Sequence, residues 1–173
     1  MLISAVLTKR FVKKKKALFT EGNVCRNLFF VEKGAFRSFT TNSDGNDDVI
    51  QLALEDHWIA DLSSFITQTP GTLSIDAIED SEVWLLPYEA IEELSVKIPQ
   101  LEVYFRRLYQ RAYVSMQQRY HSRQTKSAME RYELLIHSNM KIAARIPLLH
   151  IASYLGITAE SLSRIRKQLV KHK

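Results

Sequence analysis

The chain has 173 residues, 46% of them hydrophobic and 25% charged, with 24 Lys and Arg against 19 Asp and Glu. This length can bury one core, or a medium domain and a small one, and the modest basic excess is compatible with a polyanionic partner. The single cysteine, Cys25, excludes an intrachain disulfide and a four-cysteine iron–sulfur cluster. No apolar stretch suits a signal peptide or a transmembrane helix. We therefore expect a cytoplasmic protein that has no membrane partner.

The first half of the sequence is typical of short strands separated by turns. Asp44-Gly45 lies in an Asn- and Asp-rich stretch and predicts a hairpin. Alternating or continuous apolar runs predict strands over 17–19, 28–31, 35–40, 49–54, 73–77 and 82–86. Turn signals about every ten residues favour a closed antiparallel sandwich or barrel.

Near residue 87 the pattern changes to helices. A short helix is expected over 87–94, and a longer one begins at Pro99. A helix of ~24 residues spans about 36 Å, which is more than a small barrel needs, so we expect it to pair with its twin in a symmetric dimer. A helix packed on its own domain is the alternative. The seam, spaced by three and four residues, consists of Leu101, Phe105, Leu108, Ala112 and Met116.

The last segments predict a helix-turn-helix, with helices over 148–155 and 158–170. Ala152 is small enough for a close helix crossing, Gly156 permits a positive φ in the turn, and Thr158 is a good N-cap. Leu162, Ile165 and Leu169 share the face that would be buried. The exposed face predicted to contact DNA consists of Thr158, Ala159, Glu160, Ser161, Ser163, Arg164 and Lys167.

Charge and side-chain chemistry on this helix favour the major groove of DNA. Residues 145–173 contain six basic residues and one acidic residue. Arg164 is the expected base reader, because arginine pairs bidentately with guanine, and Glu160 could accept from cytosine. Thr158 and Ser161 are expected at phosphates. The alternative interpretation is that the two helices only pack against each other, as helix-turn-helix geometry does in some enzymes, and contact no DNA.

Three stretches together resemble the CRP/FNR family of bacterial transcription regulators. They are Phe19–Gly22 with Leu28–Arg37, Ala60–Ala77, and Ile151–Leu169. The similarity is greatest to short members typical of Bacteroidetes. It implies an α+β fold: an antiparallel, cyclic-nucleotide-binding-like β-roll over 1–98, a dimerisation helix over 99–123, and a helix-turn-helix domain over 124–173. A full β-hairpin wing is not expected, since the sequence ends at Lys173.

The resemblance also implies where an effector would bind. In cAMP-binding members a Gly-Glu pair takes the ribose and an Arg-Ser pair takes the cyclic phosphate. These pairs align with Ala60-Asp61 and Gly71-Thr72, so the arginine is absent and we expect no cAMP binding. Another small effector is still conceivable, in a pocket formed by Gln51, Trp58, Ala60, Asp61, Leu62, Gly71, Thr72 and Ser74.

The sequence thus predicts a homodimeric, sequence-specific transcription regulator that binds a pseudo-palindromic DNA site. RNA polymerase and an unidentified small effector are candidate further partners, and no metal or cofactor is expected. A cyclic-nucleotide sensor whose helices mediate only protein contacts is the rival interpretation. An enzyme is not expected, because no nucleophile–base pair, metal-ligand spacing or phosphate loop is evident.

Overall fold

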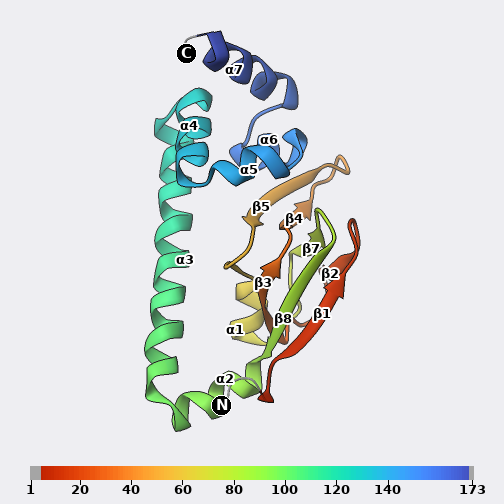
Figure 1. Cartoon of the computed structure of the whole chain (residues 1–173), viewed down its shortest axis with the longest axis vertical. Coiled ribbons are helices and arrows are strands. Elements are labelled where there is room, and N and C mark those ends of the chain that lie inside the picture. Colours follow the sequence, from red (N-terminus) through yellow and green to blue (C-terminus); the bar gives the residue numbers. More distant parts are fainter. Residues whose placement is uncertain (1–4, 172–173) are drawn as a thin grey trace. The chain divides into compact units, whose positions relative to one another are not determined.

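The computed structural model describes residues 5–171, which form two compact units that divide between Arg106 and Arg107. The first unit holds the strands, and the second is helical (Figure 1). The long helix α3 (Pro99–Thr125) begins in the first unit and ends in the second. None of the helices between residues 5 and 171 has the length and apolar character needed to cross a lipid bilayer.

The first unit contains two four-stranded antiparallel sheets, which confirms the predicted class. Their orders are β1-β8-β3-β6 and β2-β7-β4-β5. The strands are β1 (Thr8–Val12), β2 (Ala17–Phe19), β3 (Asn27–Lys33), β4 (Phe36–Thr41), β5 (Asp47–Ala53), β6 (Trp58–Ile59), β7 (Ser74–Ala77) and β8 (Ser81–Pro87). The β4–β5 hairpin turns at Asp44-Gly45 as expected, with Gly45 at φ 79°.

Side chains from both sheets form the core of this unit. Val31 and Val83 of one sheet, and Phe36, Val49 and Ile75 of the other, are almost completely buried. Two short helices complete the unit: α1 (Leu62–Thr67), between β6 and β7, and α2 (Tyr88–Lys97), directly after β8. Strands β1 and β6 and helix α1 were not among the predicted elements.

The second unit consists of the end of α3 and four further helices. These are α4 (Ala128–Ser138), α5 (Met140–Arg145), α6 (Leu148–Leu155) and α7 (Ala159–Lys171). Helix α5 follows α4 directly, because Asn139 caps it by accepting a hydrogen bond from the Lys141 N–H at 3.0 Å. Helices α6 and α7 occupy the positions expected for the helix-turn-helix.

Candidate functional site

The turn between α6 and α7 is built by backbone hydrogen bonds around Gly156. The N–H of Gly156 donates to the Ser153 carbonyl at 2.9 Å, and the N–H of Ile157 donates to the Ala152 carbonyl at 3.0 Å. Gly156 has φ 69° and ψ 41°, the left-handed conformation that only glycine adopts without strain. The chain therefore turns at Gly156, and α7 begins at Ala159.

The two helices bury the face that the sequence predicted. Ile151, Ala152 and Leu155 of α6 are at most 5% exposed, and Leu162 of α7 is completely buried. Ile165 is 8% exposed, and Leu169 is half-buried. With one side of α7 held against α6, the opposite side is left for a partner.

The first turn of α7 is capped by Thr158, also as expected. Its Oγ1 accepts a hydrogen bond from the N–H of Ser161 at 3.2 Å and donates to the Ser161 hydroxyl at 3.1 Å. The Ser161 hydroxyl also accepts a hydrogen bond from Nη2 of Arg164 at 3.3 Å. The guanidinium of Arg164 therefore already lies near the N-terminal end of the helix, where base edges are read in helix-turn-helix proteins.

The charged form of Glu160 is stabilised in the first turn of α7. Its pKa is lowered by a hydrogen bond from its own backbone N–H, by the Thr158 hydroxyl and by the charge of Arg164. Thr158, Glu160, Arg164 and Lys167 are exposed, while Ala159, Ser161 and Ser163 are half-buried. All seven residues predicted to contact DNA thus reach the surface of one helix end, and their contacts with DNA stay a prediction.

A second candidate site, the segment from Asp61 to Leu73, is closed around a buried carboxylate. Asp61 is 1% exposed and caps α1. Its Oδ1 accepts from the Ser64 N–H at 3.1 Å, and its Oδ2 accepts from the N–H groups of Thr72 and Leu73 at 2.9 and 3.0 Å. A Cβ on Gly71 would lie 2.7 Å from Oδ2, so glycine is needed for this close approach. The N–H groups of Ser64, Thr72 and Leu73 are therefore already used by the chain itself.

The other residues of the predicted effector pocket make contacts of their own within the chain. Nε2 of Gln51 donates to the Trp58 carbonyl at 2.9 Å, and the Ser74 hydroxyl accepts from the Glu21 N–H at 3.2 Å. Ala60 and Leu62 flank Asp61 in the chain and are half-buried, while Thr72 is exposed. Of the eight predicted residues, only Trp58 lines the apolar cavity described next.

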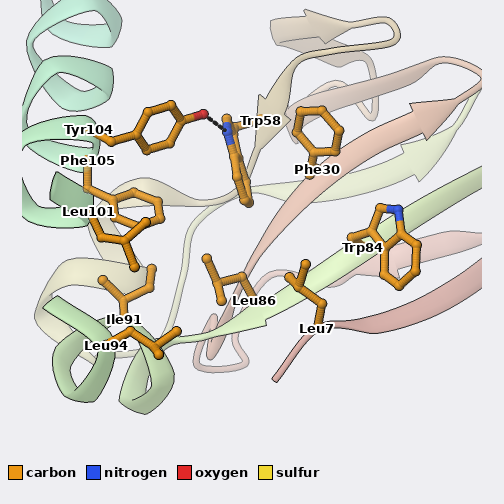
Figure 2. Close-up of a pocket in the computed structure, with 10 residues that line it drawn as sticks. All are labelled: Leu7, Phe30, Trp58, Trp84, Leu86, Ile91, Leu94, Leu101, Tyr104 and Phe105. Atoms are coloured by element: carbon orange, nitrogen blue, oxygen red, sulfur yellow. Dashed lines mark hydrogen bonds between the residues drawn. The ribbon is translucent and has the colours of Figure 1, made fainter. Parts of the chain in front are cut away.

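That cavity, of about 460 Å³, lies in the first unit between the sheet containing β3 and β8 and the helices α2 and α3 (Figure 2). The indole N–H of Trp58 donates to the hydroxyl of Tyr104 at 2.9 Å at one side of it. Its lining is otherwise apolar: Leu7, Phe30, Trp84, Leu86, Ile91, Leu94, Leu101 and Phe105. Sequence reasoning missed it, although the continuous apolar runs 28–31 and 83–86 are the pattern of strands covered on both faces.

The residues of the predicted seam on α3 fall into two groups, which differ in how far their side chains are buried. Phe105 is 6% exposed and packs edge-on against Trp58, with ring centroids 6.1 Å apart, and Leu101 is half-buried. These two residues therefore contact their own β-roll. Leu108 is half-buried, Ala112 is exposed and Met116 is 56% exposed. The second half of α3 also carries the exposed side chains of Tyr113, Val114 and Tyr120, while Val103 and Tyr104 are exposed in the first half.

Comparison with known proteins agrees with this architecture. The cyclic nucleotide-binding domain family matches residues 9–97. The transcriptional activator protein FnrA of Stutzerimonas stutzeri is 29% identical over 167 residues, which cover 90% of this chain and 68% of that protein. The fumarate and nitrate reduction regulatory protein of Vibrio cholerae is 26% identical over 170 residues, covering 91% of this chain and 66% of that protein. The chain thus spans about two thirds of the length of these relatives.

Solved structures show the same fold. FixK2 of Bradyrhizobium japonicum superposes with a TM-score of 0.84 at 22% identity, covering 96% of this chain and 86% of that one. The c-di-GMP responsive regulator CLP of Xanthomonas campestris gives 0.77 at 14% identity, covering 99% and 90%. With its two antiparallel sheets, long helix and terminal helix-turn-helix, the chain belongs to the cyclic nucleotide-binding domain family as a DNA-binding transcription regulator of the CRP/FNR type.

Proposed function

We propose that this regulator reads DNA through the N-terminal half of α7, with Arg164 and Glu160 contacting base edges. The observation that carries this proposal is the exposed, hydrogen-bonded group formed by Thr158, Ser161 and Arg164 at the start of a helix whose other side is buried. Lys167 lies one turn later and is exposed, which suits a phosphate contact.

We further propose that the regulator acts in the cytoplasm as a homodimer that pairs through the second half of α3. Exposed apolar residues there, such as Met116, have no buried environment within the chain. Two-fold symmetry then requires a pseudo-palindromic site with half-sites about one helical turn apart, ~34 Å. RNA polymerase remains a candidate partner at the promoters that contain such sites.

Selection from a random duplex pool, followed by titration at two salt concentrations, tests this function. The expected product is an inverted repeat bound with a steep salt dependence, because neutralised phosphates release counterions. Arg164→Ala should weaken binding about tenfold or more and relax the selected sequence at one position of each half-site. Arg166→Ala is the matched control, since Arg166 is exposed on the same helix two residues further on. Failure to enrich any sequence, or identical behaviour of the two variants, would contradict the proposal.

For the β-roll, we propose that it does not bind a cyclic nucleotide. The segment that would cradle a phosphate is closed around the Asp61 carboxylate, which already accepts three backbone N–H groups. A phosphate placed there would meet a buried negative charge and find no arginine at position 71. Calorimetry with cAMP and cGMP should show no saturable heat. Saturable binding of either nucleotide would instead favour the rival function, a nucleotide sensor.

A further inference from the structure

We propose that Arg119 and Arg123 are positioning residues for DNA binding, which fix the helix-turn-helix to the end of α3 by holding Tyr154. All of these groups belong to the second compact unit. Arg119 and Arg123 are four residues apart and therefore project from the same side of α3. Tyr154 is the penultimate residue of α6, directly before the turn that leads to α7.

Arg123 satisfies a carbonyl group that α6 leaves unused. The last carbonyls of a helix have no partner within the helix. In α6 the turn itself supplies N–H donors to the Ala152 and Ser153 carbonyls. The next carbonyl, that of Tyr154, accepts from Nη2 of Arg123 at 3.1 Å. A cation at this position also interacts favourably with the negative end of the helix dipole.

Arg119 contacts the side chain of Tyr154. Its Cζ lies 4.9 Å from the centroid of the Tyr154 ring, within the range of a cation–π contact. Arg123 thus binds the backbone of Tyr154 and Arg119 binds its ring. Two contacts of different kinds, made from adjacent turns of one helix, restrict both translation and rotation of α6 against α3.

The guanidinium of Arg123 lies beside the turn. A Cβ on Gly156 would be 3.5 Å from Cζ and Nε of Arg123, an ordinary van der Waals distance, so Arg123 is the side chain that neighbours the turn at this point. Two residues further on, Thr158 caps α7 and contacts Ser161, which in turn accepts from Arg164. The direction in which α7 presents Arg164 therefore follows from where Arg119 and Arg123 hold the turn.

A distance measurement within one chain tests the attachment without DNA. Nitroxide labels on Gln110→Cys and Gln168→Cys, in a Cys25→Ala background diluted with unlabelled protein, report the separation of α3 and α7. Arg119→Ala combined with Arg123→Ala should broaden the distance distribution, and Arg107→Ala, an exposed arginine elsewhere on α3, should leave it unchanged. An unchanged distribution in the double variant would overturn the proposal.

The expected effect on DNA binding rests on the proposed dimer. Comparing a palindrome with an isolated half-site distinguishes a failure of the positioning role from a failure of the dimer. Arg123→Ala should lose about tenfold in affinity for the selected palindrome but less than about threefold for an isolated half-site, because a loosened second domain lowers the effective concentration of its recognition helix. The variant should also discriminate less between the palindrome and versions with one base pair added or removed at the centre. Wild-type protein that binds palindrome and half-site equally well would contradict the dimer alone.

Conservative variants separate positioning from general stability. Tyr154→Phe keeps the ring and the carbonyl and should retain wild-type spacing preference, whereas Tyr154→Leu removes the ring and should behave like Arg119→Ala. Arg123→Lys keeps the charge and should recover part of the preference. If Arg123→Ala weakens half-site and palindrome binding equally, in parallel with its melting temperature, Arg123 is a structural residue and the positioning role is wrong.

Discussion

Oδ2 of Asp61 accepts a hydrogen bond from the N–H of Thr72 at 2.9 Å, across eleven residues of chain. This contact, together with those from Ser64 and Leu73, means that the carboxylate occupies the centre of the loop that a ligand would otherwise have to enter. The Asp61 carboxylate holds the loop in shape by accepting these three backbone hydrogen bonds. Its sensitivity to substitution follows from that role.

Replacing Asp61 should destabilise the β-roll. Asp61→Asn exchanges one acceptor oxygen for an NH₂ group that faces N–H donors, and the loss of buried hydrogen bonds to a charged group costs about 2–4 kcal/mol of the free energy of unfolding. Urea denaturation measures the change. Asp44→Asn, in the exposed β4–β5 turn, is the control and should stay within about 0.5 kcal/mol of wild type. Equal effects of the two substitutions would show that the Asp61 contacts contribute little.

A second buried charge, that of Arg37 on β4, links this strand to its two neighbours in the sheet, β7 and β5. Its Nε and Nη2 donate to the two oxygens of Asp76 at 2.8 and 2.9 Å, and Nη2 also lies 2.8 Å from Oδ2 of Asp47. Asp76→Ala should cost about 3–5 kcal/mol, because it leaves a largely buried guanidinium without its bidentate partner. Asp76→Ala combined with Arg37→Met should recover part of this loss in thermal unfolding. A double variant that is no more stable than Asp76→Ala would contradict the electrostatic explanation.

The lone thiol, Cys25, should be inert in the folded protein. It is completely buried, and burial raises its pKa despite hydrogen bonds that favour the thiolate. The neutral thiol is therefore favoured by folding, and the stability linked to it is lost as the pH rises through the raised pKa. Ellman's reagent at pH 8 should react only as fast as the protein unfolds, and at full rate in denaturant. Rapid reaction of the native protein would show that the site opens readily.

The helix-turn-helix could be predicted in detail because its determinants are local. Gly156, Thr158 and the spacing of Leu162 and Ile165 lie within ten residues, and each acts through a near neighbour. Strand β1 could not be found in this way. Its polar sequence gains a place in the sheet only by pairing with β8, where Lys9 lies opposite Trp84 and forms ion pairs of 2.6 Å with Glu32 and Glu82.

Helix α1, at the candidate effector site, could not be predicted from the local sequence either. Its six residues carry no periodic pattern, and it is capped by a carboxylate that is held from the other side by Thr72 and Leu73. The alignment with the phosphate-binding segment singled out Asp61 as a candidate residue of the effector pocket. The sequence did not indicate that the carboxylate faces its own backbone, because this depends on the closure of the whole loop.

The dimer predicted from α3 can be tested at Met116, whose side chain is 56% exposed on the part of the helix that carries other exposed apolar residues. Met116→Glu should shift the protein toward monomer in sedimentation velocity, since two carboxylates would be buried opposite each other in a symmetric contact. Val96→Glu, at an 85% exposed position of α2, is the matched control and should leave the oligomeric state unchanged. Because a monomer loses avidity, Met116→Glu should also bind the palindrome about as weakly as an isolated half-site. If the variant stays dimeric, the copies associate through another surface; if the wild-type protein is already a monomer, the chain binds DNA one half-site at a time.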